Sequence, residues 1–166
     1  MSKGEAIPYA EALRIAKRHL IPLAMLDSTE KITIVGSVRR KCDRVRDIDY
    51  QIIGSPHDVK KYFYRKEWYV EEAGSKRQVF KAPSGLYINC FFTHQDNWGA
   101  ALMHNTGPSR YNIRKRYLIK KKGWTLNQYA LYKPNDEGLY DIVAGKTEKD
   151  IYDALGWAYC EPEDRI

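Results

Sequence analysis

The stretch from residue 31 to residue 53 constrains the fold of this chain more than any other. Residues 31–35 (Lys-Ile-Thr-Ile-Val) predict a β-strand, and Gly36-Ser37 predicts a turn directly after it. Residues 47–53 (Asp-Ile-Asp-Tyr-Gln-Ile-Ile) alternate between polar and apolar side chains and predict a second strand. The gap from Ser37 to Asp47 is ten positions (47 − 37), which leaves room for one short helical turn before the chain returns.

The second predicted strand carries two carboxylates. Because side chains alternate along a strand, Asp47, Asp49 and Gln51 share one face. Neighbouring carboxylates repel unless a cation lies between them, and such hard oxygen ligands suit Mg²⁺ or Mn²⁺. Taken alone, an Asp-x-Asp pair is more often two surface aspartates on an edge strand.

The turn beside the carboxylates is suited to phosphate. Gly36 allows close approach of the backbone, Ser37 can cap the following turn, and Arg39 and Arg40 supply fork-shaped donors. Taken alone, this is an ordinary β-turn with basic neighbours. Together, the two motifs predict one site for a triphosphate and the metal that activates it.

Composition narrows the class of protein. The chain has 166 residues, a net charge of +7, 43% hydrophobic and 30% charged residues, which favours an ordered protein of one domain or two lobes with a polyanionic partner. Three widely spaced cysteines argue against a disulfide framework or zinc site, and favour an intracellular, reducing compartment such as cytoplasm or nucleoid. The sequence has no apolar run of about 20 residues and no signal peptide, so we expect no membrane partner.

Periodicity places the remaining elements and predicts an α+β fold. Tyr9, Leu13, Ala16 and Leu20 form a helical stripe, which Pro22 is expected to end or kink. Further helices are expected at 57–65, from Asp96 to about 104, at 108–122 and at 148–155. Strands are expected near 67–71, 77–81 and 85–93, and short strands or loops within 124–143.

The motifs together resemble a known family. The Gly36-Ser37-x-Arg39-Arg40 and Asp47-x-Asp49 pattern resembles the palm of the nucleotidyltransferase superfamily, and of family X DNA polymerases in particular. Thr106-Gly107, Asn112, Arg116 and residues 126–129 resemble that family's thumb. The resemblance implies a nucleotidyltransferase-type palm with a mixed sheet and helices at 1–104 and a small thumb-like C-terminal domain at 105–166. It points to the smallest viral members, which consist of palm and thumb, and to a viral or microbial source.

The resemblance also implies roles for single residues. Ser37 and Arg40 would bind the β and γ phosphates, with Gly36 allowing close approach. Asp47 and Asp49 would hold two Mg²⁺ ions, with Mn²⁺ as the alternative. The implied nucleotide contacts in the thumb are His104, Asn105, Thr106, Gly107 and Asn112. The implied DNA contacts are Arg114, Lys115, Arg116, Lys120 and Tyr129.

The third carboxylate of the family is missing. It is expected seventeen residues before Thr106, and position 89 (106 − 17) holds Asn89; no Asp or Glu occurs between Glu72 and Asp96. An asparagine at this catalytic and metal-binding position offers an oxygen but no charge, so we expect nucleotide binding with turnover lowered by orders of magnitude. Either the residue was changed to trap a substrate complex, which we favour, or the natural protein is weakened or works differently.

A second departure precedes Thr106. His104-Asn105 stands where the family usually has an aromatic pair near the sugar, and the smaller residues predict acceptance of ribonucleotides. His104 is alternatively a hydrogen-bonding group for base or phosphate, or a helix-end histidine without a role.

Basic residues cluster from Arg110 to Lys122, where seven of thirteen positions are Lys or Arg and none is acidic. We expect this helix to bind DNA phosphates and to pack inward through Ile113, Tyr117 and Leu118 or Ile119. A second candidate surface is the basic N-terminal helix, with Arg14, Lys17 and Arg18.

The leading prediction is a minimal, monomeric DNA-directed DNA polymerase that fills gaps or nicks in primer–template DNA during repair, using deoxynucleoside triphosphates. Two alternatives stay open. One is a template-independent or RNA-directed nucleotidyltransferase. The other is a catalytically silent DNA- or nucleotide-binding module.

Overall fold

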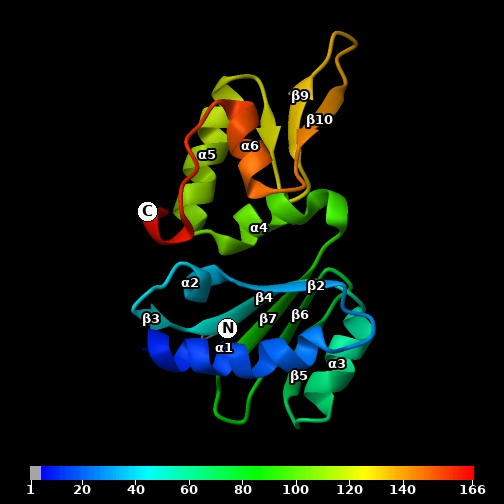
Figure 1. Cartoon of the computed structure of the whole chain (residues 1–166), viewed down its shortest axis with the longest axis vertical. Coiled ribbons are helices and arrows are strands. Elements are labelled where there is room, and N and C mark those ends of the chain that lie inside the picture. The colour runs from blue at the N-terminus through cyan, green and yellow to red at the C-terminus, as the bar shows by residue number, and fades with distance from the viewer. Residues whose placement is uncertain (1–4) are drawn as a thin grey trace. The chain divides into compact units, whose positions relative to one another are not determined.

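The computed structural model describes residues 5–166 and divides into two compact units (Figure 1). The N-terminal unit ends at Thr93, and the C-terminal unit spans His94–Ile166. The boundary expected between residues 104 and 105 lies within helix α4 (Trp98–Thr106). As predicted, the fold is α+β.

A five-stranded mixed sheet organises the N-terminal unit. Its strand order is β2-β4-β7-β6-β5. The strands are β2 (Lys31–Val35), β4 (Asp47–Ile53), β7 (Tyr87–Phe92), β6 (Arg77–Lys81) and β5 (Tyr69–Ala73). Strand β4 runs antiparallel to β2 and parallel to β7, so the two aspartates do not lie on an edge strand. The predicted strands at 31–35 and 47–53 are confirmed.

Two short elements were not predicted. Strands β1 (Ile7–Pro8) and β3 (Arg44–Val45) pair antiparallel, in register Ile7 with Val45. Two-residue strands are too short to show a period, which is why the sequence gives no signal for them.

Helices α1 (Tyr9–Ala24) and α3 (Pro56–Tyr64) belong to the core of this unit, and Figure 1 shows both on the same side of the sheet. The alternation of β4 supplies Ile48, Tyr50 and Ile52 to this core. Ala16 of α1 and Phe63 of α3 pack with them, fully buried. The residues Asp47 and Asp49 therefore face away from the hydrophobic core.

Pro22 does not end helix α1, which continues to Ala24. Proline at this position removes its own backbone donor and crowds the carbonyl four residues earlier, but few helical residues follow it. The following residue, Leu23, is fully buried in the core, and this packing stabilises the final turn.

The C-terminal unit packs three helices with a small sheet. The helices are α4, α5 (Ser109–Lys121) and α6 (Glu148–Leu155). Strands β8 (Thr125–Leu126), β9 (Leu131–Pro134) and β10 (Tyr140–Ala144) form an antiparallel sheet in the order β10-β9-β8. The 3₁₀ turns η1 (Gln95–Asn97) and η2 (Pro162–Asp164) complete the unit. The predicted helix at 148–155 is confirmed.

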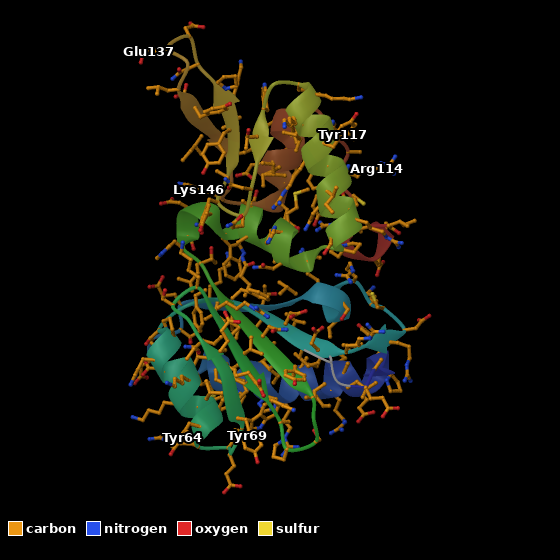
Figure 2. The ribbon with its side chains drawn as sticks, turned by 180° about the vertical axis from the view of Figure 1, so that it is seen from behind. Tyr64, Tyr69, Arg114, Tyr117, Glu137 and Lys146 are labelled. Atoms are coloured by element: carbon orange, nitrogen blue, oxygen red, sulfur yellow. The ribbon has the colours of Figure 1, made fainter. Side chains whose placement is uncertain are left out.

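Helix α5 packs inward through only one of the predicted residues, Ile119. Tyr111 and Ile119 are buried, whereas Ile113 and Tyr117 are 67% and 55% exposed. Residues eight apart lie close to one face of a helix, so a core that takes Tyr111 and Ile119 turns Ile113 and Tyr117 outward. Figure 2 shows Tyr117 and Arg114 on this helix.

Cys42, Cys90 and Cys160 are free thiols. Among residues 5–166, no helix is long and apolar enough to cross a membrane.

Candidate nucleotide and metal site

The register of the sheet brings Asp49 and Asn89 side by side. Asp49 of β4 pairs with Asn89 of β7, forty residues later in the chain (89 − 49). Directly paired residues of neighbouring strands point to the same face, which is also the face of Asp47. The position that lacks the family's third carboxylate thus lies next to the carboxylate pair.

Gly36 makes room for Asp49. It begins the short helix α2 (Gly36–Arg39) with a φ of +63°, a conformation that favours glycine. A Cβ at this position would lie 1.9 Å from Oδ2 of Asp49. Any larger residue would therefore displace the carboxylate.

Ser37 holds a polar atom without a partner. Its Oγ is buried and makes no hydrogen bond within residues 5–166. A buried hydroxyl normally has a partner, so the Ser37 hydroxyl is available to bind a ligand oxygen such as that of a phosphate. Arg40, which caps the end of α2, adds positive charge to the same turn.

Asn89 is buried and held by two hydrogen bonds. Its Nδ2 donates to Oδ1 of Asp49 at 2.8 Å, and its Oδ1 accepts from Nη2 of Arg77 at 3.1 Å. No cluster of three or more His, Cys, Asp or Glu side chains that suits a metal occurs in the described part of the chain. The donor set fits a hard cation held by Asp47 and Asp49 with phosphate oxygens, but offers no third carboxylate.

In the C-terminal unit, hydrogen bonds join three of the residues predicted to contact nucleotide or DNA, which are His104, Asn112 and Arg116. Arg116 Nη2 lies 2.7 Å from Nδ1 of His104, and Asn112 Nδ2 donates to the backbone oxygen of His104 at 2.8 Å. Burial, reinforced by the charge of Arg116, lowers the pKa of His104. The neutral ring can therefore accept the hydrogen bond from Arg116.

The other predicted thumb residues lie at the end of α4 and in the turn between β8 and β9. Asn105 and Thr106 end helix α4, and Thr106 is fully buried. Gly107 has a φ of +65° and is followed by a cis peptide bond to Pro108. Tyr129 is partly exposed, at a turn where Oδ1 of Asn127 accepts from the backbone nitrogen of Tyr129 at 2.8 Å.

The basic residues of α5 differ in their surroundings. Arg114 and Lys120 are exposed. Lys115 instead lies over three rings, with Nζ 4.4 Å from the ring centre of Trp157, 5.1 Å from Tyr111 and 5.7 Å from Tyr152. Burial lowers the pKa of Lys115. This lysine therefore packs against the aromatic residues of its own unit.

One residue of the site was missed from the sequence. Arg77 lies on β6, within no recognised motif, and reaches Asn89 only through the pairing of β6 with β7. A basic residue at the start of a predicted strand carries no local signal for such a contact.

The sequence is similar to one known protein family and to several DNA polymerases. Residues 101–166 match the DNA polymerase beta thumb family. The chain is 28% identical over 175 residues to the Repair DNA polymerase X of African swine fever virus, covering 100% of this chain and 98% of the relative. It is 25% identical over 171 residues to the DNA polymerase/3'-5' exonuclease PolX of Bacillus subtilis, covering 97% of this chain and 29% of that protein. It is 32% identical over 78 residues to the DNA polymerase IV of Saccharomyces cerevisiae, covering 47% of this chain and 12% of that protein.

The α+β fold, the aspartate pair beside a glycine–serine turn and the thumb match define a protein of nucleotidyltransferase type. These matches support the resemblance to family X DNA polymerases, and the alignment with the viral repair polymerase spans 98% of that relative.

Proposed function

We propose that this protein is a DNA-directed DNA polymerase that extends a primer 3′-OH and fills gaps during DNA repair. The observation that carries the proposal is the contact of Gly36 with Asp49, next to the unpartnered Oγ of Ser37. A site that holds a carboxylate and an unsatisfied hydroxyl beside a basic turn suits a metal-bound triphosphate. Relatives named as repair DNA polymerases support the same assignment.

Each palm residue then has a role in the transfer. Asp47 and Asp49 would hold the divalent cations, Mg²⁺ or Mn²⁺, and Ser37 and Arg40 would bind the β and γ phosphates. The cations, when bound, neutralise the triphosphate and favour ionisation of the 3′-OH. The 3′ oxygen forms a bond to the α phosphorus while the bond to pyrophosphate breaks.

Asn89 is proposed to limit this reaction. Its side chain cannot carry the charge of a third carboxylate, and its amide donates to Asp49 at 2.8 Å. Substrates would still bind, while turnover would fall by orders of magnitude.

In the thumb, His104, Asn105, Thr106, Gly107 and Asn112 are proposed to contact the nucleotide. Arg116 and Tyr129 are proposed to contact DNA, and so are the α5 residues Arg114 and Lys120. Lys115, which the sequence also predicted as a DNA contact, is proposed instead to pack over Trp157, Tyr111 and Tyr152. The absence of an aromatic pair at 104–105 predicts similar insertion of deoxyribonucleotides and ribonucleotides. Single-nucleotide insertion with each class checks this, and strong rejection of ribonucleotides contradicts it.

One observation favours a second function. The Asn89–Asp49 hydrogen bond occupies a carboxylate oxygen that a metal would need, as expected for a nucleotide- or DNA-binding module without chemistry.

Restoring the carboxylate separates the two functions. We expect Asn89→Asp to raise primer extension on gapped DNA with Mg²⁺ by about a hundredfold or more. Asn97→Asp, the same change in the 3₁₀ turn η1, is the matched control. Extension of the same primer without a template tests template independence. No gain from Asn89→Asp contradicts an impaired polymerase and favours the silent binding module.

A further inference from the structure

Arg77 reaches the candidate metal site from a neighbouring strand. In the antiparallel pairing of β6 and β7, Val79 lies opposite Asn89 and Arg77 opposite Phe91. Arg77 is thus a diagonal neighbour of Asn89 on the same face of the sheet. Its Nη2 donates to Oδ1 of Asn89 at 3.1 Å, and its Nη1 pairs with Glu72 at 3.0 Å.

The chemistry of arginine decides which way the Asn89 amide points. A guanidinium has five N–H donors and no acceptor, so the Asn89 atom that faces it is the amide oxygen. The NH₂ group must then face the opposite way, where Asp49 Oδ1 accepts from it at 2.8 Å. The two hydrogen bonds therefore run in the same direction: Arg77 donates to Asn89, and Asn89 donates to Asp49.

We propose that Arg77 is a positioning residue that locks the Asn89 amide with its NH₂ group toward Asp49, so that Asn89 competes with a divalent cation instead of ligating it. This deepens the proposed function, because it rests on Asp49 being a cation ligand. A hard cation needs oxygen lone pairs. In the locked orientation Asn89 presents hydrogens and occupies one lone pair of Asp49.

Burial makes the lock effective. Asn89 is 7% exposed, so little water can replace Arg77 as a donor to Oδ1. Without Arg77, rotation of the amide by half a turn would point Oδ1 toward Asp49. Two facing oxygens repel unless a cation lies between them, so this rotation and cation binding favour each other.

The experiment measures Mn²⁺ binding by electron paramagnetic resonance, with the full chain and without DNA or nucleotide. The variants are Arg77→Met, Asn89→Ala and the double variant, which together form a double-mutant cycle. We expect Arg77→Met to tighten Mn²⁺ binding about fivefold when Asn89 is present, and less than about twofold in the Asn89→Ala background. The second value measures the loss of the Arg77 charge alone.

Glu72→Gln serves as the matched control, because it removes the Arg77–Glu72 ion pair and leaves the hydrogen bond to Asn89. We expect no tightening from this change. Asp49→Asn identifies the site and is expected to abolish binding.

Equal effects of Arg77→Met in both backgrounds would overturn the positioning role and leave the proposed metal site intact. Mn²⁺ binding that Asp49→Asn does not weaken would contradict the metal site itself and overturn the inference with it.

Discussion

Gly36 lies so close to Asp49 that a Cβ on the glycine would stand 1.9 Å from Oδ2 of the carboxylate. The two residues come from the start of α2 and from β4, and the contact couples the backbone of the turn to a candidate metal ligand. The contact explains why a glycine, and not merely a small residue, precedes Ser37.

Substitution of Gly36 by alanine should therefore disturb the site as well as the fold. We expect Gly36→Ala to destabilise the protein by more than about 2 kcal/mol, from the φ of +63° and the displaced carboxylate, and to weaken Mn²⁺ binding. Urea unfolding and Mn²⁺ titration measure the two effects. Gly85→Ala is the control, because Gly85 has a φ of +88° but nothing within 4 Å of a Cβ. Wild-type Mn²⁺ affinity in Gly36→Ala would contradict the steric argument.

Restoring the third carboxylate should destabilise the metal-free protein. In Asn89→Asp the donor to Asp49 is lost and two carboxylates face each other, which we expect to lower the free energy of unfolding by about 1–3 kcal/mol. Millimolar Mg²⁺ should recover most of this loss, since a cation between the carboxylates removes their repulsion. Thermal unfolding with Mg²⁺ and with a chelator gives the comparison. If Mg²⁺ stabilises wild type and Asn89→Asp equally, the added carboxylate does not face the cation.

Acid should destabilise the N-terminal unit through His19. Burial, followed by the charges of Lys66 and Arg18, lowers the pKa of His19 from 6.5 to about 4. The folded state thus keeps the ring neutral, so its contribution is complete above pH 6.5 and is lost as the pH falls toward 4. Allowing for solvent screening, we expect a loss of about 1–2 kcal/mol over this range, measured by urea unfolding.

His19→Gln should flatten this pH dependence. The control His57→Gln changes a side chain that is 82% exposed and should leave it as in wild type. An unchanged acid dependence in His19→Gln would show that another group is responsible.

The buried ion pair of the C-terminal unit should be costly to break from one side. Arg165 Nη1 donates to Oε1 of Glu148 at 2.8 Å, and the two side chains are 0% and 4% exposed. Arg165→Met leaves the Glu148 carboxylate buried, and we expect a loss of about 3–5 kcal/mol in the free energy of unfolding. Lys149→Met, which breaks the exposed Lys149–Asp153 pair, should cost less than about 0.5 kcal/mol. Similar losses for both variants would refute the dependence on burial.

Substitutions of the basic residues of α5 should differ in how much they change the salt dependence of DNA binding. We expect Arg114→Gln and Lys120→Gln each to reduce the slope of log affinity against log salt by about 0.9, one phosphate contact each. Lys115→Gln should instead lower the melting temperature and change the slope little, because Lys115 lies over Trp157, Tyr111 and Tyr152. Fluorescence anisotropy with labelled DNA at several salt concentrations measures the slope. If Lys115→Gln also reduced the slope by about 0.9, this lysine would contact a DNA phosphate and the packing role would be contradicted.

Local patterns were sufficient for much of the palm. The alternation of residues 47–53 predicted β4 and the shared face of Asp47 and Asp49, since a strand's period is visible in a few residues. Glycine at position 36 predicted close approach of the backbone to a phosphate, which stays a prediction, and the structure shows in addition that this glycine makes room for the Asp49 carboxylate. The spacing from Thr106 predicted that Asn89 stands at the position of the third carboxylate. The pairing of β4 with β7 places Asn89 beside Asp49.

Only the tertiary structure decided the side-chain contacts between residues that are far apart in the sequence. Arg77 orients the Asn89 amide because β6 pairs with β7, and Lys115 packs on rings because α6 and residue 157 lie beside α5. Leu23 carries α1 beyond Pro22 because the core buries it. The sequence by itself determined the longer strands, the helical stripe and the types of ligand, since these follow from local periodicity and side-chain chemistry. The register between strands and the packing of distant segments set hydrogen-bond direction and burial, which no short pattern encodes.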